Sequence, residues 1–233
     1  MPCCWVKRRN SRRPLPSEPR REFDLTRTTL QVAQHQWTLV HPRSSESLIE
    51  EAAFAQDERL PYWADIWPSS RVLADLVVRH HGNGRRALEL GCGSGLVACA
   101  LAAAGYAVTA TDYYEAALLT TQRNVKRNTG VRIDTRLVDW QAVPDDLGTF
   151  DVVVASDVLY ERRYGPLVAE VMARVLAPAG FVMLADPGRF ALASFLERAE
   201  ALGLGLHEGW EVAHSCDGQD YSIRLRVLRR ASS

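Results

Sequence analysis

The sequence has 233 residues, of which 47% are hydrophobic and 24% are charged, as in ordinary globular proteins. Its formal net charge is zero, but residues 1–27 hold eight basic and three acidic side chains, and the remainder holds 20 basic and 25 acidic ones. This acidic main part argues against a nucleic-acid-binding protein. The longest apolar run, Leu96–Val108, is too short to span a bilayer, so we expect no membrane partner.

The five cysteines are scattered and form no CxxC pair or His/Cys cluster, so we expect no metal site. Their odd number, without a signal peptide, favours a reducing compartment, and we predict a cytoplasmic protein. Residues 1–21 are rich in Arg and Pro and are expected to form a disordered basic tail. Contact of this tail with RNA or acidic lipid stays open as an alternative.

The next segment predicts a small N-terminal unit. Residues 27–40 alternate in hydrophobicity, which predicts two short strands. A helix follows over SSESLIEEAAF, with Ser44 or Ser45 as its cap and acidic residues in its first turn. We expect residues 22–60 to cap a functional site in residues 61–233, which begin with a helix over 71–81 that ends at Gly82.

Strand and helix patterns then alternate along the chain. Helices are predicted at 94–104, 115–128, 167–176 and 190–202, and strands at 87–90, 107–112, 132–140, 150–157 and 181–186. The last segments, GLHEGWEV and YSIRLRVLRR, alternate and predict a hairpin. These patterns indicate an α/β protein with a Rossmann-like, doubly wound, mostly parallel seven-stranded sheet and an antiparallel C-terminal hairpin.

A glycine-rich turn follows the first strand of this alternation. In the run ELGCGSG, Gly91, Gly93 and Gly95 permit positive φ angles and close approach of a ligand to the backbone. The amides at the following helix start then face that ligand. Dinucleotide-binding enzymes use a related turn, but the spacing here is GxGxG behind the acidic Glu89 rather than GxGxxG.

An acidic residue ends the next strand. Asp112 lies 17 residues after Gly95, where its carboxylate can accept hydrogen bonds from both hydroxyls of a ribose. The alternative interpretation is a tight packing turn beside a surface carboxylate.

Two further strands end in polar or aromatic residues at the same sheet edge. Asp139 can accept a hydrogen bond from the amino group of an adenine, and Trp140 can pack against the face of the ring. The alternative is that Asp139 is a loop aspartate and Trp140 a core tryptophan. In the run ASDVLYE, Ser156, Asp157 and Tyr160 follow a buried strand and reach the binding crevice. The alternative for Asp157 is a cap of the next helix.

These motifs resemble those of the class I seven-β-strand S-adenosylmethionine-dependent methyltransferases. More narrowly, the chain resembles the methyltransferase-like group of protein-lysine methyltransferases, whose bacterial relatives are often described as nicotinamide N-methyltransferases. The resemblance covers about residues 55–230 and rests on PYWADIWPSS, ELGCGSG, Asp112, VDW, the DxxY pattern in SDVLY, and ADPGR at 185–189. No NPPY-type motif follows the fourth strand, which argues against methylation of adenine or of a glutamine amide.

The resemblance implies S-adenosylmethionine as the cofactor and assigns residues to it. It places cofactor contacts at Trp67, Gly91, Cys92, Gly93, Asp112, Trp140 and Ser156, to which the motifs above add Glu89, Gly95 and Asp139. The DxxY pair, Asp157 and Tyr160, is then the predicted catalytic pair.

The acceptor must be neutral when it attacks the methyl group. Deprotonating a lysine at pH 7 costs roughly 4–5 kcal/mol, so a lysine site needs a carboxylate. Asp157, with Glu161 as a second candidate, suits that role, and Tyr160 closes over the amine. A pyridine nitrogen is already neutral. We therefore predict a monomeric N-methyltransferase that acts on a protein lysine. A small-molecule, nicotinamide-like N-methyltransferase is the second hypothesis, and an inactive cofactor-binding scaffold or an RNA-tethered module is the third.

Overall fold

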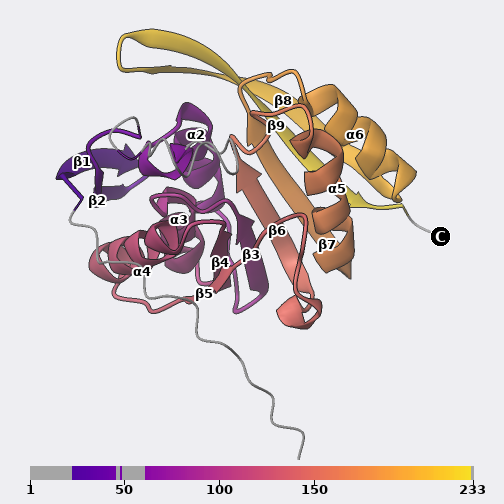
Figure 1. Cartoon of the computed structure of the whole chain (residues 1–233), viewed down its shortest axis with the longest axis horizontal. Coiled ribbons are helices and arrows are strands. Elements are labelled where there is room, and N and C mark those ends of the chain that lie inside the picture. The colour runs from indigo at the N-terminus through magenta and orange to yellow at the C-terminus, as the bar shows by residue number, and fades with distance from the viewer. Residues whose placement is uncertain (1–22, 46–47, 49–60, 232–233) are drawn as a thin grey trace, which may run out of the picture.

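The computed structural model describes residues 23–45, 48 and 61–231, so the predicted basic tail and most of the predicted helix after Ser45 lie outside the described residues. Two sheets and the helices around them make up the described part (Figure 1). The helices are α2 (Pro68–Val77), α3 (Leu96–Ala103), α4 (Glu115–Thr129), α5 (Tyr164–Val175) and α6 (Leu192–Ala201). The strands are β1 (Leu25–Val32), β2 (His35–Pro42), β3 (Arg86–Leu90), β4 (Ala107–Asp112), β5 (Asp134–Leu137), β6 (Phe150–Ser156), β7 (Leu176–Asp186), β8 (Leu204–Cys216) and β9 (Gln219–Arg230).

The central sheet has seven strands in the order β5-β4-β3-β6-β7-β9-β8. The pairs from β5 to β7 are parallel, and β9 pairs antiparallel with both β7 and β8. The predicted fold class is therefore confirmed. The strand order reverses between β3 and β6, and open α/β sheets bind their ligands at the carboxyl ends of the strands on either side of such a switch point.

Each face of the sheet has its own hydrophobic core, which explains why β6 reads as a continuous apolar run. Successive side chains of a strand point to opposite faces. Val152 and Val154 pack into the core beneath α2, α3 and α4, whereas Val153 and Ala155 pack into the core beneath α5 and α6.

Several predicted boundaries differ from the structure; among the helices, α5 begins at Tyr164 rather than at 167. The predicted strand 132–140 shortens to β5. Val138 N still donates to Asp112 O, but the chain then turns at Asp139, whose carboxylate and carbonyl oxygens accept hydrogen bonds from the amides of Gln141 and Ala142. The strand predicted at 181–186 begins earlier, at Leu176, as β7. Helix α2 ends at Val77 rather than at Gly82.

The predicted N-terminal strands form a separate two-stranded antiparallel sheet, β1–β2. Two asparagines on α4 hold it in place. The Asn124 side chain exchanges hydrogen bonds with both backbone groups of Val40, and Asn128 does the same with Thr38, at 2.9–3.1 Å. Because the two asparagines are four residues apart, they lie on the same face of α4 and continue the hydrogen-bonding pattern of β2.

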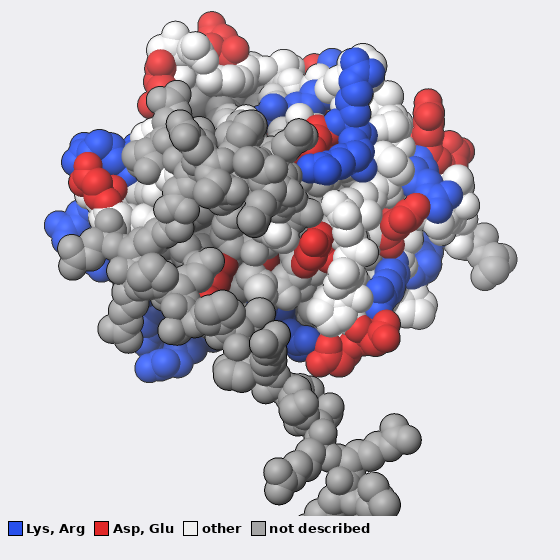
Figure 2. Space-filling model, in the orientation of Figure 1, with Lys and Arg blue, Asp and Glu red and all other residues white. Residues whose placement is uncertain are grey.

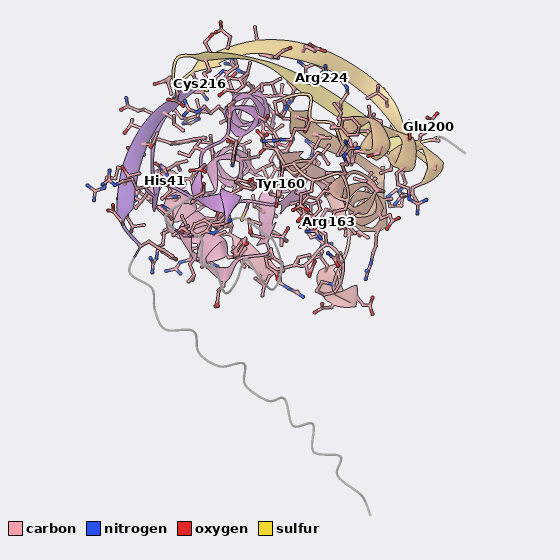
Figure 3. All side chains as sticks on the ribbon, turned by 45° about the horizontal axis from the view of Figure 1, so that its top comes forward. His41, Tyr160, Arg163, Glu200, Cys216 and Arg224 are labelled. Carbon is pink, nitrogen blue, oxygen red and sulfur yellow. The ribbon has the colours of Figure 1, made fainter. Side chains whose placement is uncertain are left out.

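The C-terminal hairpin is longer than the sheet it joins. Strand β7 pairs only with Arg224–Arg229, so the rest of β9 pairs with β8 alone. This two-stranded ribbon runs past the carboxyl end of β7 and over α2, where Arg71 forms a 3.3 Å ion pair with Asp217. Figure 3 shows Cys216 at the tip of this ribbon and Arg224 further back along it.

Across the described ranges, no helix is long and apolar enough to cross a bilayer. The same residues contain no cluster of His, Cys, Asp and Glu side chains that could hold a metal ion.

Candidate active site

A cavity of about 510 Å³ opens at the carboxyl edge of the sheet. Residues that follow β3, β4, β5, β6 and β7 line it, together with the segment that leads into α2. All the predicted site residues except Gly95 line this cavity: Trp67, Glu89, Gly91, Cys92, Gly93, Asp112, Asp139, Trp140, Ser156, Asp157 and Tyr160.

The glycine-rich turn connects β3 to α3 and holds the carboxylate of Asp112. Gly93 N donates to Asp112 Oδ2 at 3.0 Å, and Tyr114 N donates to the other oxygen, Oδ1, at 3.0 Å. Gly93 has a φ of +52°, and a Cβ there would lie 3.1 Å from the carbonyl oxygen of Trp63. A glycine is therefore needed where the turn approaches the segment before α2.

Gly95 lies outside the cavity and has a packing role instead. It precedes α3 with a φ of +86°, and a Cβ there would lie 2.8–3.0 Å from atoms of Thr121 on α4. The Thr121 hydroxyl in turn donates to the carbonyl oxygen of Gly93 at 2.9 Å. Gly95 therefore lets α4 pack closely enough to brace the glycine-rich turn.

We expect Gly95→Ala to destabilise the protein more than Gly105→Ala. Both glycines have φ angles above +80°, so both substitutions carry a similar backbone cost of about 1 kcal/mol. Only Gly95 lacks room for a Cβ, since nothing lies within 4 Å of the Cβ position at Gly105. Overpacking adds about 1–3 kcal/mol. Urea unfolding of the two variants measures the difference, and equal losses would contradict the packing role.

Two buried carboxylates lie beneath this turn. Burial raises the pKa of Asp112 to about 6, although hydrogen bonds from the amides of Tyr114 and Gly93 partly oppose the shift. Burial, and then the charge of Asp112, raise the pKa of Glu89 well above its usual range. Glu89 Oε2 has no hydrogen-bond partner in the described part of the chain. The site therefore contains carboxylate oxygens that still have room to accept hydrogen bonds.

Cys92 lies in the same turn and is buried. Its Sγ lies 3.4 Å from the hydroxyl oxygen of Thr121, and burial raises the thiol pKa well above its usual range. The thiol therefore stays neutral, which excludes a nucleophilic role.

Aromatic rings form a continuous wall of the cavity. Tyr160 contacts Tyr62 and Tyr164 edge-on, with ring centroids 5.2 and 5.0 Å apart. Tyr164 in turn contacts Trp140 at 5.3 Å, and Tyr62 contacts Trp67 at 5.8 Å. Burial raises the pKa of Tyr160 far above its usual range, so its hydroxyl stays protonated. Tyr62 and Tyr164 were not predicted from the sequence.

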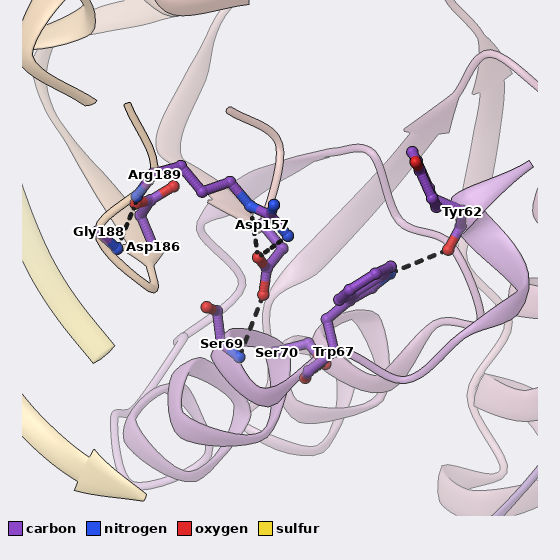
Figure 4. A network of polar contacts seen from close by, with 8 residues as sticks. All are labelled: Tyr62, Trp67, Ser69, Ser70, Asp157, Asp186, Gly188 and Arg189. Carbon is purple, nitrogen blue, oxygen red and sulfur yellow. Dashed lines mark hydrogen bonds and ion pairs between the residues drawn. The ribbon is translucent and has the colours of Figure 1, made fainter. Parts of the chain in front are cut away.

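Asp157 makes contacts that the sequence did not predict (Figure 4). Its Oδ1 accepts hydrogen bonds from Arg189 Nε and Nη2 at 3.0 and 2.8 Å, and its Oδ2 accepts one from Ser69 N at 3.3 Å. The Asp157 side chain is only 2% exposed. Its φ is +57°, which aspartate tolerates better than most residues. The carboxylate predicted to orient the acceptor is therefore already bonded on both oxygens.

Arg189 is the main cavity residue that was not predicted from the sequence. It was noted only as part of the ADPGR motif. Residues that end neighbouring parallel strands meet at one sheet edge, and Ser156 of β6 pairs with Ala185 of β7. The rule that found Asp157 after β6 therefore also applies to the residues that follow β7. There Asp186 accepts hydrogen bonds from the amides of Gly188 and Arg189, and this turn brings the Arg189 side chain back to Asp157.

Comparison with known proteins gives this geometry its context. Residues 87–180 match the model of a methyltransferase domain. Residues 87–180 are therefore a methyltransferase domain, as the motifs predicted. S-adenosylmethionine is the cofactor that the resemblance to this class implies.

Among curated proteins, the methyltransferase is 30% identical over 164 residues to ribosomal protein L11 methyltransferase of Xanthomonas oryzae, covering 70% of this chain and 48% of that one. It is 27% identical to protein-lysine N-methyltransferase rrg1 of Schizosaccharomyces pombe, covering 73% and 57%. It is 28% identical to a ubiquinone biosynthesis O-methyltransferase of Paracidovorax citrulli, covering 80% and 86%. The chain thus spans about half the length of the first two relatives.

Among solved structures, the N-methyltransferase NodS of Bradyrhizobium japonicum, in complex with S-adenosylhomocysteine, has the same fold. The TM-score is 0.57 at 20% identity, and the match covers 81% of this chain and 98% of NodS.

The described residues of the methyltransferase fit its cofactor. Backbone amides of Gly93, Tyr113 and Tyr114 donate to Asp112, and because a carboxylate offers about four lone-pair sites, its oxygens keep room for a ribose hydroxyl. The unpartnered Oε2 of Glu89 is a second acceptor in the same wall. The cavity is lined by six acidic side chains and, among the described residues, by a single cation, Arg189. Asp157 pairs with Arg189 and Glu161 with Arg163, and burial favours the neutral form of Glu89, so the excess of negative charge comes from the other three. Such a lining favours a cationic sulfonium group.

Proposed function

We propose that this methyltransferase transfers a methyl group from S-adenosylmethionine to an amine nitrogen, and that the acceptor is a lysine side chain of a protein. The character of the cavity lining carries this proposal. Carboxylates and aromatic faces both attract cations, and a lysine reaches the site as an ammonium ion. A neutral phenol or a neutral pyridine gains much less from the same lining.

The residues that we infer to bind the cofactor are those predicted from the sequence, without Gly95. Asp112 is placed to bind the ribose, and Trp140 and Asp139 to bind the adenine. The glycine-rich turn presents its backbone to the cofactor. The rest of this part of the cavity wall is formed by Trp67, Glu89, Cys92 and Ser156. The cofactor supplies an electrophilic methyl group on a positively charged sulfur.

The rest of the cavity orients the acceptor and excludes water. Tyr160, whose ring is held between Tyr62 and Tyr164, is placed to cover the acceptor amine. Asp65 also lines the cavity, and its carboxylate makes no ion pair with a described residue. We therefore infer that Asp65 is available to attract the ammonium group, whose proton must leave before attack.

We also infer that residues 61–233 form the catalytic unit and that residues 22–60 cap it. The supporting contact runs through buried His41 of β2, whose ring nitrogens bond to Ala64 O and to the Thr28 hydroxyl, both at 2.9 Å. Ala64 lies between two cavity residues, Trp63 and Asp65. We further propose that the protein acts as a monomer in the cytoplasm.

Labelled-cofactor transfer tests the acceptor. The protein is incubated with tritiated S-adenosylmethionine and a lysate of the source cell, and the products are separated by size and then hydrolysed. We expect label in one protein band and, after hydrolysis, in methylated lysine. Label confined to the small-molecule fraction would instead support the second candidate, a small-molecule N-methyltransferase, and label on oxygen would exclude both.

A further inference from the structure

We propose that Arg189 binds a carbonyl or carboxylate oxygen of the acceptor, next to the amine that is methylated. This inference rests on the proposed function, because it names the group that the amine must carry. Arg189 then determines which amines are accepted.

The first argument is accessibility. The Asp157 side chain is 2% exposed, whereas the Arg189 side chain is 28% exposed and lines the cavity. Both side chains line the cavity, but the guanidinium is the more exposed of the two and is therefore the group that a ligand reaches more readily. Nε and Nη2 each donate one hydrogen bond to Asp157, and a guanidinium has five N–H donors. Three donors remain for another partner.

The second argument is preorganisation. The backbone amide of Arg189 is held by Asp186, its guanidinium is held by Asp157, and its charged carbon lies 5.5 Å from the ring centroid of Trp67. Figure 4 shows how Asp157 lies between Arg189 and Ser69 at the start of α2. An arginine fixed in this way loses little conformational entropy when an oxygen binds to it.

The third argument is position along the sheet edge. Asp112 ends β4, and Arg189 follows β7, with β3 and β6 between them. Neighbouring strands are about 4.8 Å apart, so the two side chains start roughly 14 Å from each other along the edge. If Asp112 binds the ribose, Arg189 lies across the switch point, in the half of the cavity that the cofactor leaves to the acceptor.

The fourth argument is the contrast in charge. Among the described residues that line the cavity, Arg189 is the only cation beside six acidic side chains. The carboxylates attract an ammonium group and repel the oxygens of an acceptor. An acceptor oxygen in this cavity therefore has Arg189 as its favourable partner. An amine with an oxygen at the right distance is therefore preferred over a plain alkylamine.

Three probes of one length test this inference by binding alone. In 6-aminohexanoate the amine and the carboxylate carbon are separated by five carbon atoms, as are the amine and the backbone carbonyl carbon of lysine. The compound 6-aminohexanamide replaces the carboxylate with a neutral carbonyl, and hexylamine lacks the oxygen. Their dissociation constants are measured by ligand-observed NMR with the protein saturated with S-adenosylhomocysteine.

We expect the wild-type protein to bind at least one of the oxygen-bearing probes about tenfold more tightly than hexylamine, which is the size of one hydrogen bond to a charged group. In Arg189→Gln this preference should fall to within about threefold. A preference for the acid would indicate a free amino-acid-like acceptor, and equal binding of acid and amide would indicate a peptide carbonyl. Either result supports the assignment to Arg189.

Arg198→Gln is the matched control. Arg198 also donates through Nε and Nη2 to a single carboxylate oxygen, at 3.0 and 2.7 Å, but its partner is Glu170 on the exposed surface of α5 and α6. Figure 2 shows acidic and basic side chains intermixed over that side of the molecule. This variant should keep the full preference.

Equal binding of all three probes to the wild-type protein would overturn the inference, and so would a preference that survives in Arg189→Gln. If Arg189→Gln does not fold, Arg189→Lys replaces it, and a preference undiminished in that variant would count equally against the proposal. No probe needs to be methylated. Failure of transfer to protein would therefore refute the proposed function and leave this test unaffected.

Discussion

Replacing Asp157 with alanine is expected to lower the free energy of unfolding by roughly 2–4 kcal/mol and to abolish methyl transfer. Removal of one partner of a buried ion pair costs about 3–5 kcal/mol, and the partial exposure of Arg189 reduces that figure. Alanine also tolerates the φ of +57° less well than aspartate does. Urea unfolding measures the stability, and transfer of tritiated methyl groups measures the activity.

Two further variants separate the contributions. Asp157→Asn keeps the shape and the tolerance of positive φ but loses the charge, so it should retain more stability than Asp157→Ala while activity still falls. Glu170→Ala breaks the comparable surface pair with Arg198 and should change the free energy of unfolding by less than about 1 kcal/mol. A fully stable Asp157→Ala would show that the ion pair in Figure 4 contributes nothing to the fold.

The sequence predicted most of the residues that line the Asp112 side of the cavity, because their positions depend on local rules. A glycine-rich turn after a strand and an acidic residue at the end of the next strand are both short-range patterns. Their meeting follows from the parallel pairing of β3 with β4, which brings Gly93 and Asp112 together. Trp140 was also placed correctly in the cavity, although its strand was predicted to be too long.

The Arg189 side of the cavity was harder to predict because its contacts join distant parts of the chain. Asp157 and Arg189 are 32 residues apart, and Ser69 is 88 residues from Asp157. Nothing near Asp157 in the sequence indicates that its carboxylate would be occupied. The prediction that Asp157 is the group that orients the acceptor treated it as a free side chain. The structure supports a positioning role for Asp157, exerted through Arg189.

The aromatic wall was missed for a related reason. Tyr62 lies before α2 and Tyr164 begins α5, and neither belongs to a strand end of the central sheet. Each contacts Tyr160 only once the sheet has brought the segment before α2 beside the loop after β6. Residue type alone could not distinguish these tyrosines from others on the surface.

Cofactor affinity is expected to fall as the pH decreases through about 6, because Asp112 must be ionised to accept a hydrogen bond from a ribose hydroxyl. With a pKa of about 6, most of the carboxyl is protonated at pH 5, so S-adenosylhomocysteine should bind about tenfold more weakly there than at pH 8. Isothermal titration calorimetry across this range measures the change.

The same pKa shift acts on the stability of the cofactor-free protein with the opposite sign. The folded-state value lies above the ordinary value of 3.8, so burying the ionised carboxylate costs stability. The stability contributed by protonated Asp112 is complete below about pH 4 and is lost as the pH rises through about 6. At neutral pH the ionised, buried carboxylate of Asp112 therefore lowers the stability of the cofactor-free protein, and binding of the cofactor offsets that loss.

Asp112→Ala tests this assignment directly. At pH 8 it should weaken binding of S-adenosylhomocysteine by about 1.5–3 kcal/mol, roughly 10- to 150-fold, and the remaining affinity should no longer depend on pH between 5 and 8. Glu89 also has a raised pKa, so Glu89→Gln is the control. If the pH dependence disappears in Glu89→Gln and persists in Asp112→Ala, then Glu89 is the titrating group and the ribose assignment to Asp112 is wrong.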